Sequence, residues 1–105
     1  MTQRTDIKDP LELVPYTADF TDRLAAIDVA ETITSVTSVV ATVYQGTDTA
    51  PSAILSGGTT ISGSKKVVQL ITGGLDGVDY KIKIDVLTST GKQLVIAGIV
   101  PVRSK

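Results

Sequence analysis

Residues 80–86 alternate strictly between apolar and charged side chains, and no other feature constrains the fold as strongly. The first, third, fifth and seventh side chains are apolar: Tyr80, Ile82, Ile84 and Val86. The side chains between them are charged: Lys81, Lys83 and Asp85. Side chains of a β-strand alternate between its two faces, so one face meets a core and the other meets water. Glycine-containing turns at residues 72–77 and 89–91 bracket the stretch, which predicts a central strand with a neighbour on each side.

The rest of the chain reads as short strands separated by glycine-rich turns. We expect these strands over residues 16–22, 32–44, 53–55, 59–62, 65–72 and 93–102, with a turn at 56–58. Residues 24–30 could form a short helical turn, but the stretch is short for a helix, so we expect a loop that carries buried Leu24 and Ile27. The pattern predicts an all-β fold, an immunoglobulin-like antiparallel β-sandwich of six to seven strands.

Two local details remain open at the level of sequence. In residues 32–44, Val39 and Val43 share one face while Val36 and Val40 share the other, and a bulge near Ser38 would reconcile them. Residues 1–15 are polar, and the prolines at positions 10 and 15 favour extended geometry in the residues before them. We therefore divide the chain into an extended N-terminal arm, residues 1–15, and a sandwich, residues 16–105; the alternative for the arm is a frayed end.

The composition excludes most chemistry. The 105 residues contain no cysteine and no histidine, which removes disulfides, the commonest metal ligands and the commonest general base. Tryptophan is absent, so stacking platforms for sugars or single-stranded nucleic acid are scarce. The net charge of −1 gives no general attraction to nucleic acid or to a membrane surface. We expect no signal peptide and no membrane span, because no basic segment precedes an apolar stretch and no apolar run approaches roughly 20 residues. We expect no enzyme activity, no cofactor and no metal.

Two glycine-rich segments resemble ligand-binding loops only superficially. Residues 58–65 approximate a phosphate-binding loop, but a serine precedes Lys65 and a strand follows where a helix is required. Residues 73–79 approximate a calcium-binding repeat, but Asp76 and Asp79 supply too few oxygen ligands. We interpret the first segment as a tight hairpin and the second as a structural turn.

Leu75, Gly77 and Tyr80 form a pattern typical of a tyrosine corner. In immunoglobulin-like sandwiches such a tyrosine opens the penultimate strand, and its hydroxyl bonds the backbone a few residues upstream. The alternative is an ordinary half-buried tyrosine.

Several motifs together resemble a phage protein family, the small immunoglobulin-like fiber–tail adaptors. The matching segments, in order, are residues 8–10, 16–24, 31–36, 71–74 with Gly77 and Tyr80, and 88–92. The family often has tryptophan where this chain has Phe20. The resemblance implies a virion structural protein, made in the host bacterial cytoplasm and placed in the tail, neck or fiber-attachment region.

The resemblance further implies contacts with other virion proteins (tail, neck, portal-side or fiber components), a homo-oligomeric ring, and no nucleic acid or membrane partner. The alternative is a cell-surface or extracellular immunoglobulin-like module for adhesion or carbohydrate binding. The missing signal peptide and the missing tryptophan argue against that module.

Charge and hydropathy suggest where such contacts would form. Residues 1–31 hold seven acidic and three basic residues, a net −4, and residues 32–105 hold four acidic and seven basic residues, a net +3. An acidic arm and a basic sandwich surface would suit a head-to-tail ring, which needs two complementary surfaces on each subunit. The last strand is apolar on both faces, so its outward side chains need cover from a partner or from the arm. The candidate interface residues are Asp6, Asp9, Glu12, Lys65, Lys66, Lys81, Lys83, Val95, Ala97 and Ile99.

Overall fold

The computed structural model describes residues 2–4 and 7–104. Its strands are β1 (Thr2–Arg4), β2 (Leu13–Asp19), β3 (Ile33–Gln45), β4 (Leu55–Ser62), β5 (Lys66–Thr72), β6 (Asp79–Thr88) and β7 (Gln93–Pro101). A short helix α1 (Thr21–Ala25) follows β2, and a single 3-10 turn η1 (Pro51–Ile54) precedes β4. No helix in these two ranges is long and apolar enough to cross a membrane.

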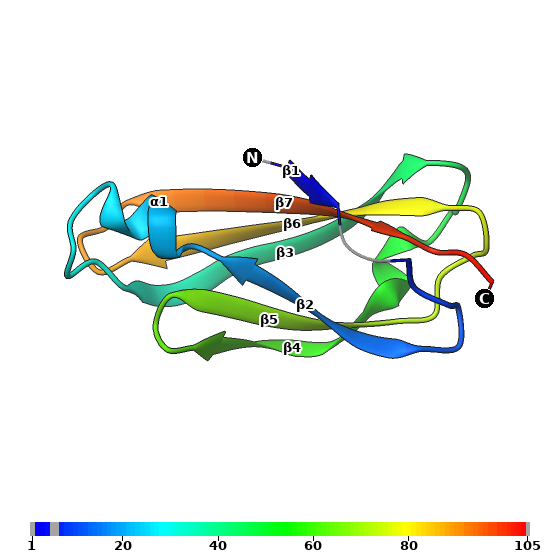
Figure 1. Ribbon diagram of the computed structural model, residues 1–105, viewed down its shortest axis with the longest axis horizontal. Helices are drawn as coiled ribbons and strands as arrows, with labels where there is room; N and C mark the ends of the chain where they lie inside the picture. Colours follow the sequence, from blue (N-terminus) through cyan, green and yellow to red (C-terminus); the bar gives the residue numbers. More distant parts are fainter. Residues whose placement is uncertain (1, 5–6, 105) are drawn as a thin grey trace.

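The strands form two facing sheets that run along the long axis of the molecule (Figure 1). One sheet has the order β1-β7-β6-β3 and the other has the order β2-β5-β4. Neighbouring strands are antiparallel except for β1, which lies parallel to β7. This arrangement confirms the predicted immunoglobulin-like β-sandwich, and β6 is a central strand flanked by β7 and β3, as its alternation predicts.

The core lies between the two sheets. On β6 every predicted inward side chain is fully buried: Tyr80, Ile82, Ile84 and Val86. From the facing sheet, alternate residues of β2 and β5 complete the core; Tyr16 and Ala18 of β2 are buried, as is Phe20 directly after it. The Tyr16 ring passes over Gly98 of β7 so closely that a Cβ atom at position 98 would lie 2.6 Å from Tyr16 Cε1. Glycine at this position therefore lets the two sheets pack together.

The bulge expected near Ser38 is present in β3. The register with β6 shifts between Val36 and Ser38, so Val36 opposes the buried Val86 and Val39 opposes the buried Ile84. Both valines consequently pack against the core although they are three residues apart. Val40 faces outward and is 45% exposed.

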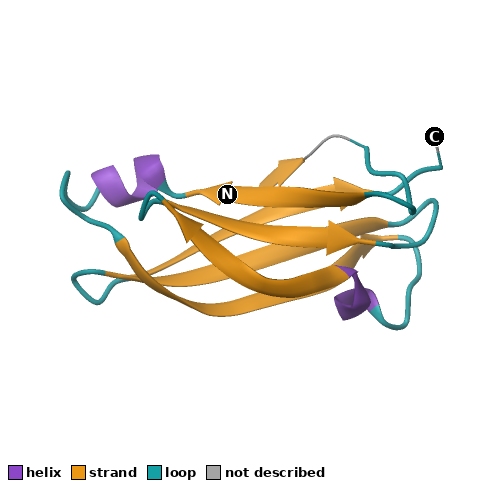
Figure 2. Cartoon of the chain, turned by 90° about the horizontal axis from the view of Figure 1, so that it is seen from below, coloured by secondary structure: helices purple, strands orange, loops and turns teal. Residues whose placement is uncertain are grey.

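The segment after β2 differs from the prediction. Residues 21–25 form the helix α1 rather than a loop, at the opposite end of the sandwich from η1 (Figure 2). The Asp19 carboxylate accepts hydrogen bonds from the Thr21 N–H and hydroxyl, which turns the chain out of β2. Leu24 is buried as predicted, but Ile27 lies beyond the end of the helix and is 36% exposed, so its predicted burial is wrong. A helix of five residues has only one inward position, so its sequence contains no detectable periodic pattern of apolar residues from which a helix could be predicted.

Residues 51–62 also differ from the prediction. Residues 51–54 form η1 instead of starting a strand, and β4 then runs without a turn through the glycines at 57 and 58. The glycines produce a register shift between Ser56 and Thr60. The buried Gln69 amide donates hydrogen bonds to the carbonyls of Ser56, 3.2 Å away, and Gly57, 3.3 Å away, which holds the irregular backbone in the sheet. The segment 56–58, expected to be a turn, is thus a bulge within β4. It is stabilised by Gln69, which lies on the neighbouring strand β5.

The N-terminal part is more closely attached to the sandwich than an extended arm requires. β2 begins at Leu13, three residues before the expected start. Lys8 is buried, and its backbone forms an isolated parallel bridge with Val102. The backbone thus joins the sandwich from residue 8 onward, while β1 pairs with β7 on the outer edge of the four-stranded sheet.

Candidate functional site

Tyr80 is the second residue of β6 and joins two loops at the end of the sandwich where the C-terminus lies. Its buried hydroxyl accepts a hydrogen bond from the Leu75 N–H at 2.9 Å and donates one to Asp48 Oδ2 at 2.6 Å. Burial, followed by the hydrogen bond to Asp48, raises the pKa of Tyr80 to about 12. In the other direction, the hydrogen bond from Tyr80 lowers the pKa of Asp48. The hydrogen bond from the Leu75 N–H confirms the predicted tyrosine corner. The sequence did not predict the contact with Asp48, which lies 32 residues away along the chain.

Lys8 supplies a second polar contact at the same end. Its ammonium group is buried and donates to the carbonyls of Gly73 at 2.7 Å and Asp9 at 2.8 Å. Burial lowers the pKa of Lys8, although the nearby carboxylates of Glu12 and Asp9 act to raise it. The Lys8 backbone N–H also donates to Pro101 O at 2.9 Å. Lys8 therefore fastens the entering chain to the β5–β6 loop and to the end of β7.

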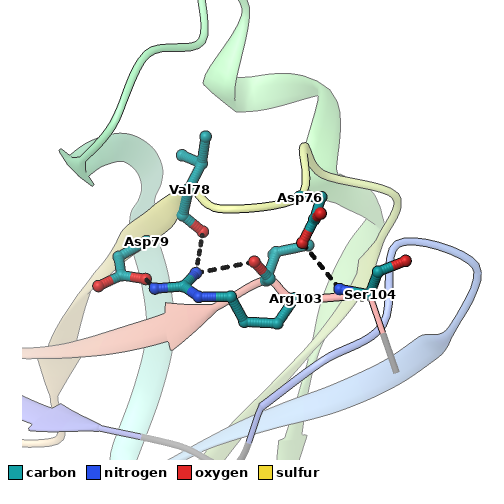
Figure 3. Close-up of polar contacts among 6 residues, drawn as sticks. Asp76, Val78, Asp79, Arg103 and Ser104 are labelled. Atoms are coloured by element: carbon teal, nitrogen blue, oxygen red, sulfur yellow. Dashed lines mark hydrogen bonds and ion pairs between the residues drawn. The ribbon is translucent and has the colours of Figure 1, made fainter.

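The C-terminal residues are held beside these contacts (Figure 3). Arg103 forms an ion pair with the buried Asp79 at 2.8 Å, and its guanidinium also approaches the Val78 carbonyl at 3.5 Å. The Ser104 N–H donates to Asp76 Oδ1 at 2.8 Å. Asp76 and Asp79, which the sequence could suggest as calcium ligands, are thus engaged with the end of their own chain.

Glu31 organises the opposite end of the sandwich. Its buried carboxylate accepts hydrogen bonds from Thr90 Oγ1 at 2.5 Å and from Ser89 Oγ at 3.2 Å, in the turn between β6 and β7. The hydroxyls of Thr88 and Thr90 lower the pKa of Glu31 most strongly. This residue therefore ties the entrance of β3 to the β6–β7 turn.

These polar clusters join loops of one chain. Among residues 2–4 and 7–104, no group of three or more histidine, cysteine, aspartate or glutamate side chains is placed to hold a metal ion. The phosphate-loop-like segment is the β4–β5 hairpin, whose tip uses positive φ at Gly63 and Ser64. The calcium-repeat-like segment is the β5–β6 loop. The two segments are thus a hairpin and a turn-containing loop, as the sequence predicts.

The four candidate lysines do not form one surface. Lys66 opposes Asp19 on the outer face of the three-stranded sheet, because its neighbour Val67 points into the core. Lys81 and Lys83 lie on the outer face of the other sheet, since Ile82 between them is buried. Lys65 lies at the turn before β5. The structure therefore separates the expected basic surface into two opposite faces.

The acidic candidates are placed near the Lys8 contact. Asp9 Oδ1 accepts a hydrogen bond from the Leu11 N–H at 2.9 Å, and the Asp9 N–H donates to Glu12 Oε1 at 2.8 Å. Asp9 and Glu12 are half-buried and stabilise a local turn before β2. Asp6 lies outside the described residues.

The three outward side chains of β7 are covered within the chain to different degrees. Ala97 is 7% exposed and Ile99 is 3% exposed, while Val95 is half-buried. β1 pairs with β7 in the register Thr2 to Ala97 and Arg4 to Ile99, so the chain's own N-terminal strand lies against this part of β7. Their role in contacts between subunits stays a prediction.

Comparison with protein-family models gives a match, whereas comparison with individual proteins does not. No curated protein and no solved structure matches the chain. A family model, described as podophage GP4 fiber-tail adaptor protein gp77, matches residues 8–100. The matched range begins at the buried Lys8 and ends one residue before the end of β7. The chain belongs to this podophage fiber–tail adaptor family.

Proposed function

We propose that the chain is a non-enzymatic structural protein of the phage particle, an adaptor in the tail or neck region that links fibers or neighbouring components through protein–protein contacts. The observation that carries this proposal is the family match over residues 8–100. The geometry supports it, because the buried polar side chains described above stabilise loops and leave the sheet edges and outer faces as the surfaces for partners. The protein acts in the virion, after synthesis in the host bacterium.

Purified particles test this role. A phage that lacks the gene should assemble heads but lose its fibers or the components at that junction, and supplying the chain in trans should restore them. Mass spectrometry of wild-type particles should find the chain in several copies per particle. Particles that contain none of the chain, or that carry normal fibers without it, would contradict the proposed function.

We propose further that the subunits form a ring in which the residues before Lys8 act as the arm and contact a neighbouring subunit. In the single chain, β1 occupies only three register positions on β7, and parallel pairing is slightly less stable per residue than antiparallel pairing. Exchange of β1 between subunits would keep the same backbone pairs, so it costs little energy. The net −4 of residues 1–31 and the net +3 of the remainder favour contact between unlike parts of two subunits.

Deletion of residues 1–6 separates this arm from the sandwich, because it removes β1 and keeps Lys8 and β2. The truncated protein should remain folded by circular dichroism but fail to enter particles, and native mass spectrometry should show fewer oligomers. Higher salt should weaken oligomers of the full chain, because salt screens the attraction between exposed charges. At 0.1 M salt this attraction decays over about 10 Å, and the decay length becomes shorter as salt is added. Normal incorporation of the truncated protein would show that the arm has no role in assembly.

A further inference from the structure

One continuous stretch of the chain, which contains β3 and β4, is nearly free of charge. Residues 32–64, which we call the neutral flank, contain a single charged residue, Asp48. At the chain average of 20% charged residues, 33 residues would hold about seven. Asp48 itself accepts hydrogen bonds from the Tyr80 hydroxyl and the Ala50 N–H, so it is engaged with the protein. Depletion of charge is the compositional mark of the centre of a protein–protein interface.

The neutral flank contains two sheet edges. β3 is the last strand of the four-stranded sheet and β4 is the last strand of the three-stranded sheet. The two strands lie on the same side of the sandwich, where β3 packs across from η1 and β4. An edge strand presents unpaired N–H and C=O groups, and isolated proteins protect such edges with charges, prolines or irregular backbone.

β3 lacks the usual protection over its central part. It runs for 13 residues without a charge or a proline. From Ser38 to Val43 it pairs with β6 in unbroken register, so every second residue there directs its backbone N–H and C=O to the free side. The other edges are poorer templates: β4 is interrupted at its glycines, β2 contains Pro15 and Asp19, and β1 has three residues.

Side chains along this edge define what could pair with it. Val39 and Val43 of β3 and Leu55 at the start of β4 are half-buried and pack against the core from the two sheets. On the outward side, Val40 is 45% exposed and Tyr44 is 56% exposed. A strand beside β3 would direct alternate side chains toward the half-buried group and the others outward, beside Val40. The matching segment is thus uncharged and apolar at every second position.

None of the strands that the structure describes fills this edge. Its N-terminal strand lies on β7, at the opposite edge of the same sheet, and its C-terminal residues are fixed beside Asp76 and Asp79. A second copy of the sandwich is a poor occupant as well. The register shifts between Val36 and Ser38 and between Val43 and Gln45 bend and twist β3, which hinders pairing with another rigid sheet edge. A flexible extended segment can follow such a strand.

We infer that the free edge of β3 binds an extended, uncharged segment of a different virion protein by strand addition. This mode obtains affinity from main-chain hydrogen bonds and specificity from the alternate side chains. The inference rests on the proposed adaptor function and assigns one of its contacts to residues 38–43.

Two direct measurements identify the occupant. Amide hydrogen exchange of residues 36–44 should be slower in particles than in the free protein. A photo-crosslinking amino acid in place of Tyr44 should join the chain to an extended segment of another virion protein. Unchanged exchange in particles that contain the chain, or crosslinks only to a second copy, would refute this contact and leave the adaptor function intact. Absence of the chain from particles would instead refute the adaptor function itself.

Discussion

The two buried tyrosines should respond in opposite ways to loss of their hydroxyl groups. The Tyr80 hydroxyl has two partners, the Leu75 N–H and the Asp48 carboxylate. The Tyr16 hydroxyl is also buried, yet it has no hydrogen-bond partner among residues 2–4 and 7–104. Tyr80→Phe therefore leaves polar groups unpaired, whereas Tyr16→Phe removes an unpaired polar atom from the core.

The expected magnitudes differ enough to measure. Removing one partner of a buried hydrogen bond costs about 1–3 kcal/mol. For a domain of about 100 residues this corresponds to a decrease in Tm of roughly 5–15 °C for Tyr80→Phe. Tyr16→Phe should leave the Tm unchanged or raise it, because the hydroxyl is desolvated without compensation. Tyr44→Phe is the control, since this side chain is 56% exposed and should change stability by less than about 0.5 kcal/mol.

The pH dependence separates a hydrogen-bonding effect from a packing effect. The pKa of Tyr80 is raised from 10.0 to about 12 in the folded protein, so its contribution is complete below pH 10 and is lost as the pH rises toward 12. The pKa of Asp48 is lowered from 3.8, chiefly by Tyr80, so that contribution is lost as the pH falls below about 4. The difference in free energy of unfolding between wild type and Tyr80→Phe should thus be widest between these limits. Equal stability of the two proteins at pH 7, together with a destabilised Tyr16→Phe variant, would refute the hydrogen-bond assignment.

Three further substitutions test the packing and the polar contacts by thermal denaturation. Gly98→Ala should destabilise the protein by about 1–3 kcal/mol or more, because its Cβ overlaps the Tyr16 ring, and adding Tyr16→Leu should recover part of the loss. Ile84→Asp should unfold the domain, while Lys83→Asp on the outward face should have little effect; the reverse order would invert the assignment of the β6 faces. Glu31→Gln should destabilise the protein at pH 7, and this deficit should shrink as the pH falls below 4.5, because the pKa of Glu31 is lowered from 4.5 in the folded protein; a deficit that is the same in acid would show a role in packing alone.

The sequence predicts the fold well wherever its pattern is local and periodic. The alternation over residues 80–86 identifies β6 and its buried face, because a period of two allows only one assignment of inside and outside. The valines near Ser38 indicate a bulge, because two sets of apolar residues on opposite faces can reach one core only if the register shifts. The tyrosine corner follows from residues five positions apart, Leu75 and Tyr80.

The sequence predicts less where the partner of a residue is distant or where an element is very short. Gln69 holds the bulge of β4 from a neighbouring strand, so the glycines at 57 and 58 resemble a turn when considered alone. Helix α1 has five residues and one buried side chain, which is too few for a period. The grouping of Lys66 with Lys83 fails for a related reason, since charge along the chain carries no information about which sheet a strand joins.

The distribution of stabilising contacts suggests why this sandwich suits an adaptor. The molecule measures 42 × 22 × 22 Å, with strands along its long axis, and buried polar side chains fix the loops at both ends. Glu31 fixes one end, and Lys8 and Tyr80 fix the other. Such a subunit can hold two partners at a set separation, because neither end needs to become ordered on binding. The cost of ordering then falls on the partner segment, and an uncharged edge such as that of β3 lets main-chain hydrogen bonds offset this cost without also burying an ion.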